Sequence, residues 1–306
     1  NFRNEILWCY TGPSSAKKDF PRKHDTILRY VKGNEWTFNE AALRKPYKCE
    51  FTPARTLDTL SKGNGNDVDE KEMRKKHELG KIPEDWWSDM SNVSSWRKEL
   101  LGYPTQKPES LLERIIKASS NDGDVVLDPF CGCGTTVTVA NRLKRRWIGI
   151  DITHLAINLM KHRLYAQDAV PGREYEVIGE PKDIEGATQL AKEDEYQFQL
   201  WALGLDKARP TGGIKKGSDK GIDGKRFFWN PIKKKDETIL YSVKCGYVGP
   251  KDVRDLKGTV ENNHAAIGVL ITLEPITKDM REEAAKGGSY KPNGFAENIF
   301  PTIQVY

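Results

Sequence analysis

The first thirty residues contain two apolar runs with the composition of β-strands. Glu5–Tyr10 and Asp25–Val31 are rich in isoleucine, leucine, tyrosine and tryptophan, and a polar stretch containing Gly12 and Pro13 separates them. Runs of this kind, interrupted by a turn, predict two strands joined by a loop. The loop also carries a group of basic side chains: Lys17, Lys18, Arg22, Lys23 and His24.

From residue 108 the pattern changes to alternating helices and strands. Pro108 is expected to begin a helix, because proline is favoured at the first helical position and the apolar residues that follow recur at helical spacing. The order strand, glycine loop, helix, strand, acid, helix predicts half of an α/β nucleotide-binding fold. Its elements are expected at Val125–Leu127 (a short buried strand), Thr135–Leu143, Trp147–Ile150 and Ala156–Leu164.

A polar stretch at residues 171–187 reads as a linker, with a possible strand at Tyr175–Ile178. A second series of helices and strands follows it, at Asp194–Leu205, Thr238–Lys244, Pro250–Asn262, Ala265–Thr272 and Thr277–Gly287. Residues 212–224 are rich in glycine, lysine and aspartate and are expected to form a loop. We therefore expect an α/β protein with two domains, at residues 1–170 and, smaller, at residues 188–306.

Composition narrows the setting of the protein. The chain has 306 residues and a formal net charge of +5, which permits a polyanionic partner but is also ordinary surface variation. No apolar run approaches the ~20 residues that a membrane-spanning helix needs, so no membrane contact is expected. The five cysteines are scattered, without the spacing of a disulfide framework or a zinc site. A reducing, cytoplasmic setting is expected.

The glycine loop at residues 128–135 has the chemistry of a nucleoside site. Glycines let a ligand approach the backbone closely, and Asp151, about 20 residues further on, could accept hydrogen bonds from ribose hydroxyls. A dinucleotide fingerprint would place a third glycine where Val137 stands. An acid such as Asp128 beside the glycines disfavours a pyrophosphate but suits a ligand with an ammonium group. S-adenosylmethionine is such a ligand.

Four segments resemble motifs of the amino-methylating DNA methyltransferases. Asp128-Pro-Phe-Cys-Gly-Cys-Gly-Thr135 is similar to motif I, Gly102-Tyr-Pro-Thr-Gln-Lys-Pro108 to motif X, Asp151 to the acid of motif II, and Asn4-Glu-Ile-Leu-Trp8 to motif VIII. Their order is that of the β-type arrangement. The resemblance covers roughly the first half of the chain.

This resemblance implies a Rossmann-like domain that binds S-adenosylmethionine and methylates an exocyclic amino nitrogen of adenine or cytosine in double-stranded DNA, in a restriction-modification system. The implied cofactor-binding residues are Thr105, Gln106, Lys107, Pro108, Asp128, Pro129, Phe130, Gly132, Gly134, Thr135 and Asp151. It also implies a target-recognition region at residues 45–100. There, basic and aromatic residues such as Lys75, Trp86 and Trp96 are interleaved, a pattern that suits nucleic acid but also a charged helix face with core tryptophans.

One element of that family is missing. Its catalytic motif IV, an Asp/Ser/Asn-Pro-Pro-Tyr-type tetrapeptide that holds the amino group of the flipped base, should precede motif VIII, and the sequence contains no Pro-Pro pair. Either the chain is incomplete at its N-terminus or the protein cannot methylate alone. The abrupt start at Asn1, inside a motif, favours an incomplete chain.

The second half resembles the Mrr-like branch of the PD-(D/E)xK nuclease fold. Gly217-Ser-Asp-Lys-Gly-Ile-Asp-Gly224, the strand ending in Lys244 and the apolar strand at residues 266–272 carry the likeness. It implies a catalytic set of Asp223, Ser242, Lys244 and Glu195, with Mg²⁺ on Asp223. Ser242 departs from the family, which carries Glu or Gln there. A Mg²⁺-dependent endonuclease and a non-catalytic DNA-binding module, each with a cofactor-sensing first domain, therefore stay open as alternatives.

Overall fold

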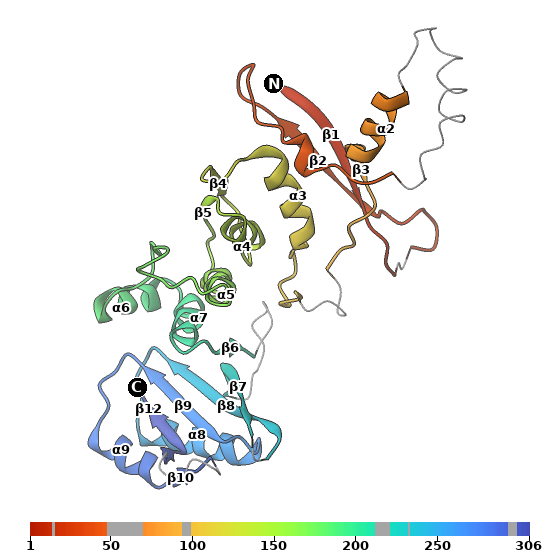
Figure 1. Ribbon diagram of the computed structural model, residues 1–306. Helices are drawn as coiled ribbons and strands as arrows, with labels where there is room; N and C mark the ends of the chain where they lie inside the picture. Colours follow the sequence, from red (N-terminus) through yellow and green to blue (C-terminus); the bar gives the residue numbers. More distant parts are fainter. Residues whose placement is uncertain (14–15, 48–69, 94–98, 212–220, 232, 293–298) are drawn as a thin grey trace. The chain divides into compact units, whose positions relative to one another are not determined.

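The protein divides into two compact α/β units in a computed structural model that describes residues 1–13, 16–47, 70–93, 99–211, 221–231, 233–292 and 299–306 (Figure 1). The first unit is Asn1–Asp151 and the second is Ile152–Tyr306. A mixed α/β fold with a second α/β unit is confirmed. The sequence-based domain bounds assign residues 152–170 to the first domain, whereas the second compact unit begins at Ile152. The bounds of the domains stay a prediction.

A small sheet opens the first unit. Strands β1 (Phe2–Cys9) and β2 (His24–Tyr30) form an antiparallel hairpin, as predicted, and β3 (Trp86–Trp87) adds to β1 in parallel. Trp8 of β1 is only 1% exposed, and its indole nitrogen donates to the Met90 carbonyl oxygen at 2.9 Å. The buried face of this sheet is therefore built around one tryptophan with a satisfied polar atom.

Helix α3 (Glu109–Ser119) packs against two layers. Its Leu111 joins the Trp8 cluster, and its Ile116 packs with the buried Val139 of helix α4 (Thr135–Arg142). Pro108 is the residue before the helix, in extended backbone, so the helix begins one residue later than predicted. The apolar side chains from which α3 was predicted thus pack on one side against the hairpin sheet and on the other against α4.

Strands β4 (Val125–Asp128) and β5 (Arg146–Gly149) form a two-stranded parallel sheet. Val126 faces the α3–α4 cluster, but Val125 and Leu127 are 49% and 58% exposed. Val125–Leu127 was expected to be a buried strand. That expectation is wrong for Val125 and Leu127, whose side chains are exposed. In the described residues, helices pack on only one face of this pair, and successive side chains of a strand point to opposite faces.

The expected recognition region is described in part. Helix α2 (Glu70–Leu79) presents several exposed basic side chains, while Trp87 is buried beside Trp8 and Trp86 is 56% exposed. Trp96 lies outside the described residues, as do residues 48–69. Of the two tryptophans described, one therefore fits a core position and one a surface position. The 3-10 helix η1 (Glu40–Ala42) completes the elements of the first unit.

The second unit is a five-stranded sheet in the order β12-β9-β8-β7-β6. The pairs β8–β9 and β9–β12 are parallel, while β7–β8 and β6–β7 are antiparallel. The strands are β6 (Arg209–Pro210), β7 (Gly224–Asn230), β8 (Lys235–Lys244), β9 (Ile267–Thr272) and β12 (Ile303–Val305). A separate short pair is formed by β10 (Ser289–Tyr290) and β11 (Phe300–Pro301).

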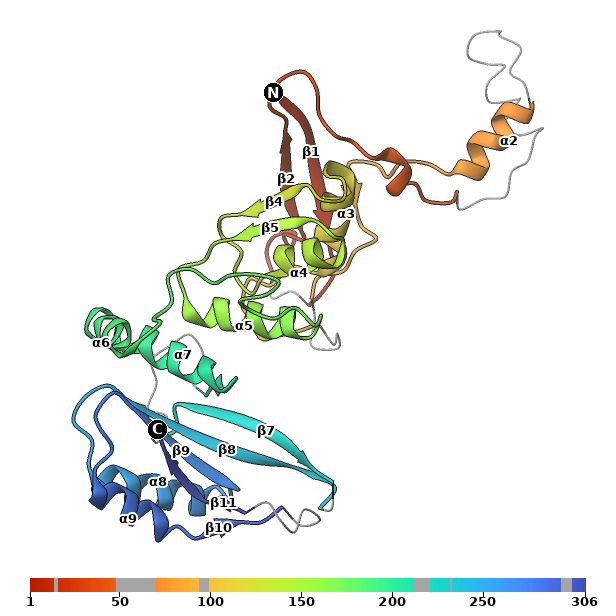
Figure 2. The same cartoon turned by 60° about the vertical axis from the view of Figure 1, so that its left-hand side comes forward.

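Helices cover both faces of this sheet (Figure 2). Helices α8 (Pro250–Asn262) and α9 (Lys278–Ala285) pack on one face, and α6 (Ile184–Glu193) and α7 (Glu195–Leu205) on the other. Helix α5 (His154–Tyr165) packs on α7, where Asn158 donates to the Leu200 carbonyl oxygen at 2.8 Å. The strand pattern of buried apolar residues agrees with a sheet that is covered twice.

The structure differs from the expectations for residues 171–187 in two places. The segment interpreted as a linker contains most of the first turn of α6, which begins at Ile184. Within it, residues 175–178 form no strand, only one isolated bridge between Pro171 and Tyr175. Strand β12 was not expected, because Ile303–Val305 is too short to stand out as an apolar run. In the described residues, no helix is both long enough and apolar enough to cross a membrane.

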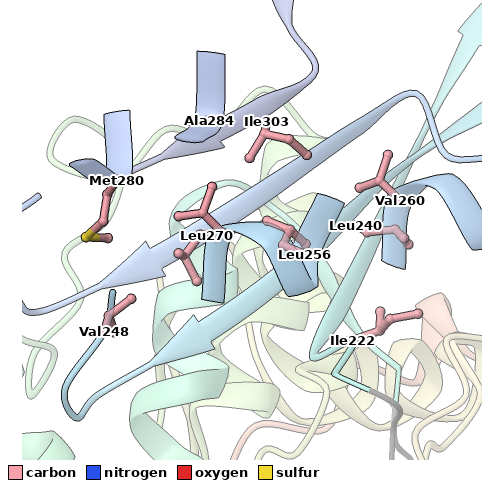
Figure 3. Close-up of a cluster of buried hydrophobic side chains, with 10 residues drawn as sticks. Ile222, Leu240, Val248, Leu256, Val260, Leu270, Met280, Ala284 and Ile303 are labelled. Atoms are coloured by element: carbon pink, nitrogen blue, oxygen red, sulfur yellow. The ribbon is translucent and has the colours of Figure 1, made fainter. Parts of the chain in front are cut away.

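The core between the sheet and helices α8 and α9 is closely packed (Figure 3). Leu270 of β9 is fully buried at its centre, together with Leu240, Leu256 and Met280. Truncating a buried leucine removes apolar contacts and leaves a cavity. The stability of the second unit therefore depends on this cluster.

We expect Leu270→Ala to lower the free energy of unfolding of the second unit by about 2–5 kcal/mol, the range for leucine truncation in a core. Leu205→Ala, at a position 64% exposed, is the matched control and should change it by less than about 0.5 kcal/mol. Urea unfolding followed by circular dichroism measures both. Equal effects of the two variants would contradict the packing described.

Candidate cofactor site

The loop between β4 and α4 is shaped by two glycines with left-handed backbone. Gly132 has a φ of 50°, and Gly134, at the N-terminus of α4, has a φ of 75°. A Cβ on Gly132 would lie 3.1 Å from the Tyr103 ring. A side chain at Gly132 would therefore meet both backbone strain and a close aromatic neighbour.

Asp128 ends β4 and is held in place by its own loop. One carboxylate oxygen accepts from the Phe130 backbone N–H at 3.1 Å, and the other accepts from the Thr136 hydroxyl at 2.6 Å. The contact with Thr136 was not expected from the sequence. Its only sequence signal is its place in the first turn of the helix that follows the glycines.

Asp151, just beyond β5, closes the loop from the other strand. Its carboxylate accepts from the Gly132 backbone N–H at 2.9 Å. The Cys131 N–H donates to the Ile150 carbonyl oxygen at 3.0 Å, and this second bond also holds the glycine loop against the end of β5. The structure therefore brings together the glycine loop and the acid that the spacing predicted.

Close packing of α4 on β5 depends on Gly149. A Cβ at this position would lie 2.6 Å from Cγ2 of Val137 and 3.2 Å from the Cys131 sulfur. The glycine lets the helix approach the strand, and this sets the distance between the loop and Asp151. The sequence did not single out Gly149 or Val137 as functional. Both act by positioning the glycine loop relative to Asp151.

The segment at residues 102–108 lies against the glycine loop. The Thr135 hydroxyl donates to the Lys107 carbonyl oxygen at 3.2 Å, and Tyr103 packs at Gly132. Gln106 is 7% exposed, and its side-chain oxygen accepts from the Leu101 N–H at 2.9 Å. Thr105 is exposed and Pro108 is buried. The two segments that were matched to separate motifs thus form one site.

The loop carries negative charge. Burial, together with the nearby carboxylates of Asp128 and Asp151, raises the pKa of the Cys131 thiol to about 12. The thiol therefore stays protonated at neutral pH and is no nucleophile. Two carboxylates at one end of a parallel strand pair favour a ligand with positive charge and hydroxyl groups. Phe130 is 89% exposed beside them, and Pro129 is exposed as well.

These features fit S-adenosylmethionine. The ligand combines ribose hydroxyls, which an acid such as Asp151 can accept from, with a sulfonium and an ammonium group, which suit a carboxylate-lined loop. A pyrophosphate would be repelled by both acids.

In the second unit, three of the four expected nuclease residues meet at the end of β8. The Asp223 N–H donates to the Tyr241 carbonyl oxygen at 2.8 Å, and its carboxylate accepts from the Val243 N–H at 2.7 Å. Asp223 therefore lies beside Ser242 and Lys244, which share one face of β8. Ser242 is 5% exposed. Lys244 forms no ion pair within the described ranges, so the alternative of a structural Asp223–Lys244 pair finds no support.

Glu195 lies next to this group, where it accepts from the Cys245 thiol at 3.2 Å. In the described part of the chain, no group of three or more His, Cys, Asp or Glu side chains is placed to hold a metal. A serine hydroxyl in the second position is a poorer ligand for Mg²⁺ than the carboxylate oxygens that the ion prefers, so the donor set fits a catalytic Mg²⁺ ion poorly. The roles expected for these four residues stay predictions.

Comparison with known proteins gives relatives for the first half of the chain. It is 36% identical over 164 residues to type II methyltransferase M.HpaI of Haemophilus parainfluenzae, covering 53% of this chain and 45% of that protein. It is also 36% identical over 164 residues to DNA adenine methyltransferase YhdJ of Escherichia coli (strain K12), covering 53% and 52%. The chain spans about half the length of these curated relatives.

A solved structure, of a putative DNA modification methylase from Thermus thermophilus complexed with S-adenosyl-L-methionine, is 23% identical and covers 60% of each chain with a TM-score of 0.34. Residues 214–294 match the model of a second family, described as NACHT-associated inactive Restriction Endonuclease 1. The match supports a restriction endonuclease-like second unit.

Residues 1–162 match the family model described as DNA methylase, N6_N4_Mtase. This match spans the hairpin sheet and the site described above, with its glycine loop and Asp151. Because it covers more than half of the chain, the chain belongs to the N6_N4_Mtase family of DNA methylases.

Proposed function

We propose that the first unit supplies the cofactor site and part of the DNA-binding surface of a restriction-modification methyltransferase. The enzyme transfers a methyl group from S-adenosylmethionine to an exocyclic amino nitrogen of adenine or cytosine in double-stranded DNA, in the cytoplasm. The observation that carries the proposal is the Gly132–Asp151 contact, which places a carboxylate from one strand at the glycine loop of the next.

In this proposal each group has a defined task. Asp151 accepts hydrogen bonds from the ribose, Asp128 and the backbone of residues 102–108 receive the methionine end, and the exposed Phe130 offers a ring to the adenine. Bound S-adenosylmethionine supplies an electrophilic methyl group. The residues of this chain hold and orient that group; the base amine needs acceptors of the Pro-Pro-Tyr type, which residues 1–306 do not contain.

We expect Asp151→Ala to weaken S-adenosylmethionine binding by about ten- to a hundredfold, because hydrogen bonds to a charged group contribute about 1.5–3 kcal/mol. Asp122→Ala is the matched control, since that side chain is 74% exposed and its partner Arg145 keeps a hydrogen bond to the Ser120 carbonyl oxygen at 2.8 Å. Calorimetric titration measures both affinities. Unchanged affinity in Asp151→Ala would contradict the assigned role of this residue.

We also expect residues 1–306 to bind cofactor without transferring its methyl group to DNA. The test incubates the chain with duplex DNA and methyl-labelled S-adenosylmethionine, with Asp151→Ala as the control. Label should remain on the wild-type protein and stay out of the DNA. Failure of the wild-type protein to retain label would overturn the proposed function. Labelled DNA would show that another group in this chain holds the base amine.

For the second unit we propose a nuclease-like domain that does not cut DNA. The support is local: Asp223 bonds to the Val243 N–H, next to Lys244, while the position two residues before Lys244 holds the buried and neutral Ser242 in place of Glu or Gln. Two-metal or one-metal phosphodiester hydrolysis needs a charged oxygen donor set that orients the attacking water.

We expect no Mg²⁺-dependent cleavage of methylated or unmethylated plasmid by residues 1–306. Agarose electrophoresis after incubation in Mg²⁺ measures this, with Lys244→Ala as the comparison. Cleavage by the wild-type chain that disappears in Lys244→Ala would establish the endonuclease alternative in place of this proposal.

A further inference from the structure

A cavity of about 730 Å³ opens between the β1–β2 hairpin and the start of α3. None of the comparisons assigns a role to it. Its walls come from the hairpin and from the segment that precedes and begins α3. The lining residues are Trp8, Arg22, His24, Asp25, Thr26, Ile27, Lys107 and Leu111.

The charges of this cavity do not balance. Lys107 and Asp25 compensate each other through an ion pair at 2.8 Å, and Asp25 also accepts from the Tyr10 hydroxyl at 3.3 Å. Arg22 is exposed and, within the described ranges, forms no ion pair or hydrogen bond; the same holds for the side chain of His24. The cavity therefore has one uncompensated guanidinium and one imidazole at its wall.

Lys107 links this cavity to the cofactor loop. Its carbonyl oxygen accepts from the Thr135 hydroxyl at 3.2 Å, while its ammonium group points to Asp25 on the hairpin. The ammonium also lies 5.4 Å from the centre of the Trp8 ring. One residue thus contacts the glycine loop by its backbone and the cavity by its side chain.

We propose that this cavity holds a backbone phosphate of the DNA substrate, bound by Arg22 and supported by Lys107 and His24. The inference rests on the proposed function, which brings DNA to this unit, and it adds the place where one phosphate is held. Arginine suits such a site because its planar guanidinium can donate two parallel hydrogen bonds to phosphate oxygens.

A phosphate fits this cavity better than a nucleobase. The only indole in the wall, Trp8, is 1% exposed, so its face is not open for stacking. Stacking on an open aromatic face is what holds an unpaired base in most single-strand sites. The donors of Arg22 and His24 and the hydroxyl of Thr26 instead match the acceptor oxygens of a phosphate.

The experiment compares three variants in fluorescence-anisotropy titrations of a duplex at several salt concentrations, with S-adenosylmethionine bound. Arg22→Gln removes the uncompensated charge. Lys18→Gln is the matched control, because it removes one charge from the same loop at an exposed residue that does not line the cavity. Asp25→Asn releases Lys107 from its ion pair and so adds one available cation.

We expect Arg22→Gln to lower affinity about three- to tenfold and to reduce the slope of log K against log salt by about 0.9, the value for one phosphate contact. Lys18→Gln should change the slope by less than half as much. Asp25→Asn should tighten binding. The affinity for S-adenosylmethionine, measured by calorimetry, should be unchanged in Arg22→Gln. This result would separate a DNA-binding role of the cavity from cofactor binding at the glycine loop.

Three outcomes would overturn the inference while leaving the cofactor site intact. The first is equal loss in Arg22→Gln and Lys18→Gln, which would indicate only the general charge of the loop. The second is no DNA binding by a chain that binds cofactor. The third is Arg22-dependent binding of polyglutamate as tight as that of DNA, which would assign the cavity to an acidic polypeptide.

Discussion

The hydrogen bond from the Gly132 amide to the Asp151 carboxylate is the contact on which the site depends. It requires β4 and β5 to lie side by side in parallel, so that an acid after one strand meets the loop after the other. That arrangement in turn requires α4 to pack close to β5, which the absence of a side chain at Gly149 allows. Gly132, Gly149 and Asp151 thus set how β4, β5 and α4 pack together.

Local patterns predicted the elements of this layer well. The glycine loop, Asp151 and the helix after Pro108 depend on short-range rules of backbone conformation and spacing, which a sequence displays directly. The exposed face of β4 could not be predicted, because Val125 and Leu127 are apolar and their burial depends on what packs above them. Strand β12 was missed for a related reason, since three residues acquire strand structure only through pairing with β9.

The two units differ in how completely their chemistry is present. In the first, Lys107 and Asp151 contact the glycine loop directly, and Tyr103 and Thr136 make further contacts that hold the loop in place. In the second, Asp223 bonds to the backbone N–H of Val243, next to Lys244, and Ser242 offers a neutral hydroxyl where the resembling nucleases carry Glu or Gln.

We infer that the loop at residues 128–135 and Asp151 form one pocket for S-adenosylmethionine. The most direct test is a titration of isotopically labelled protein with S-adenosylhomocysteine, followed by backbone amide resonances in NMR spectra. Saturable shifts are expected at Gly132, Gly134 and Asp151, while the resonances of β8 and β9 in the second unit should stay unchanged. Saturable binding that leaves the Gly132 and Gly134 amides unshifted would contradict this inference.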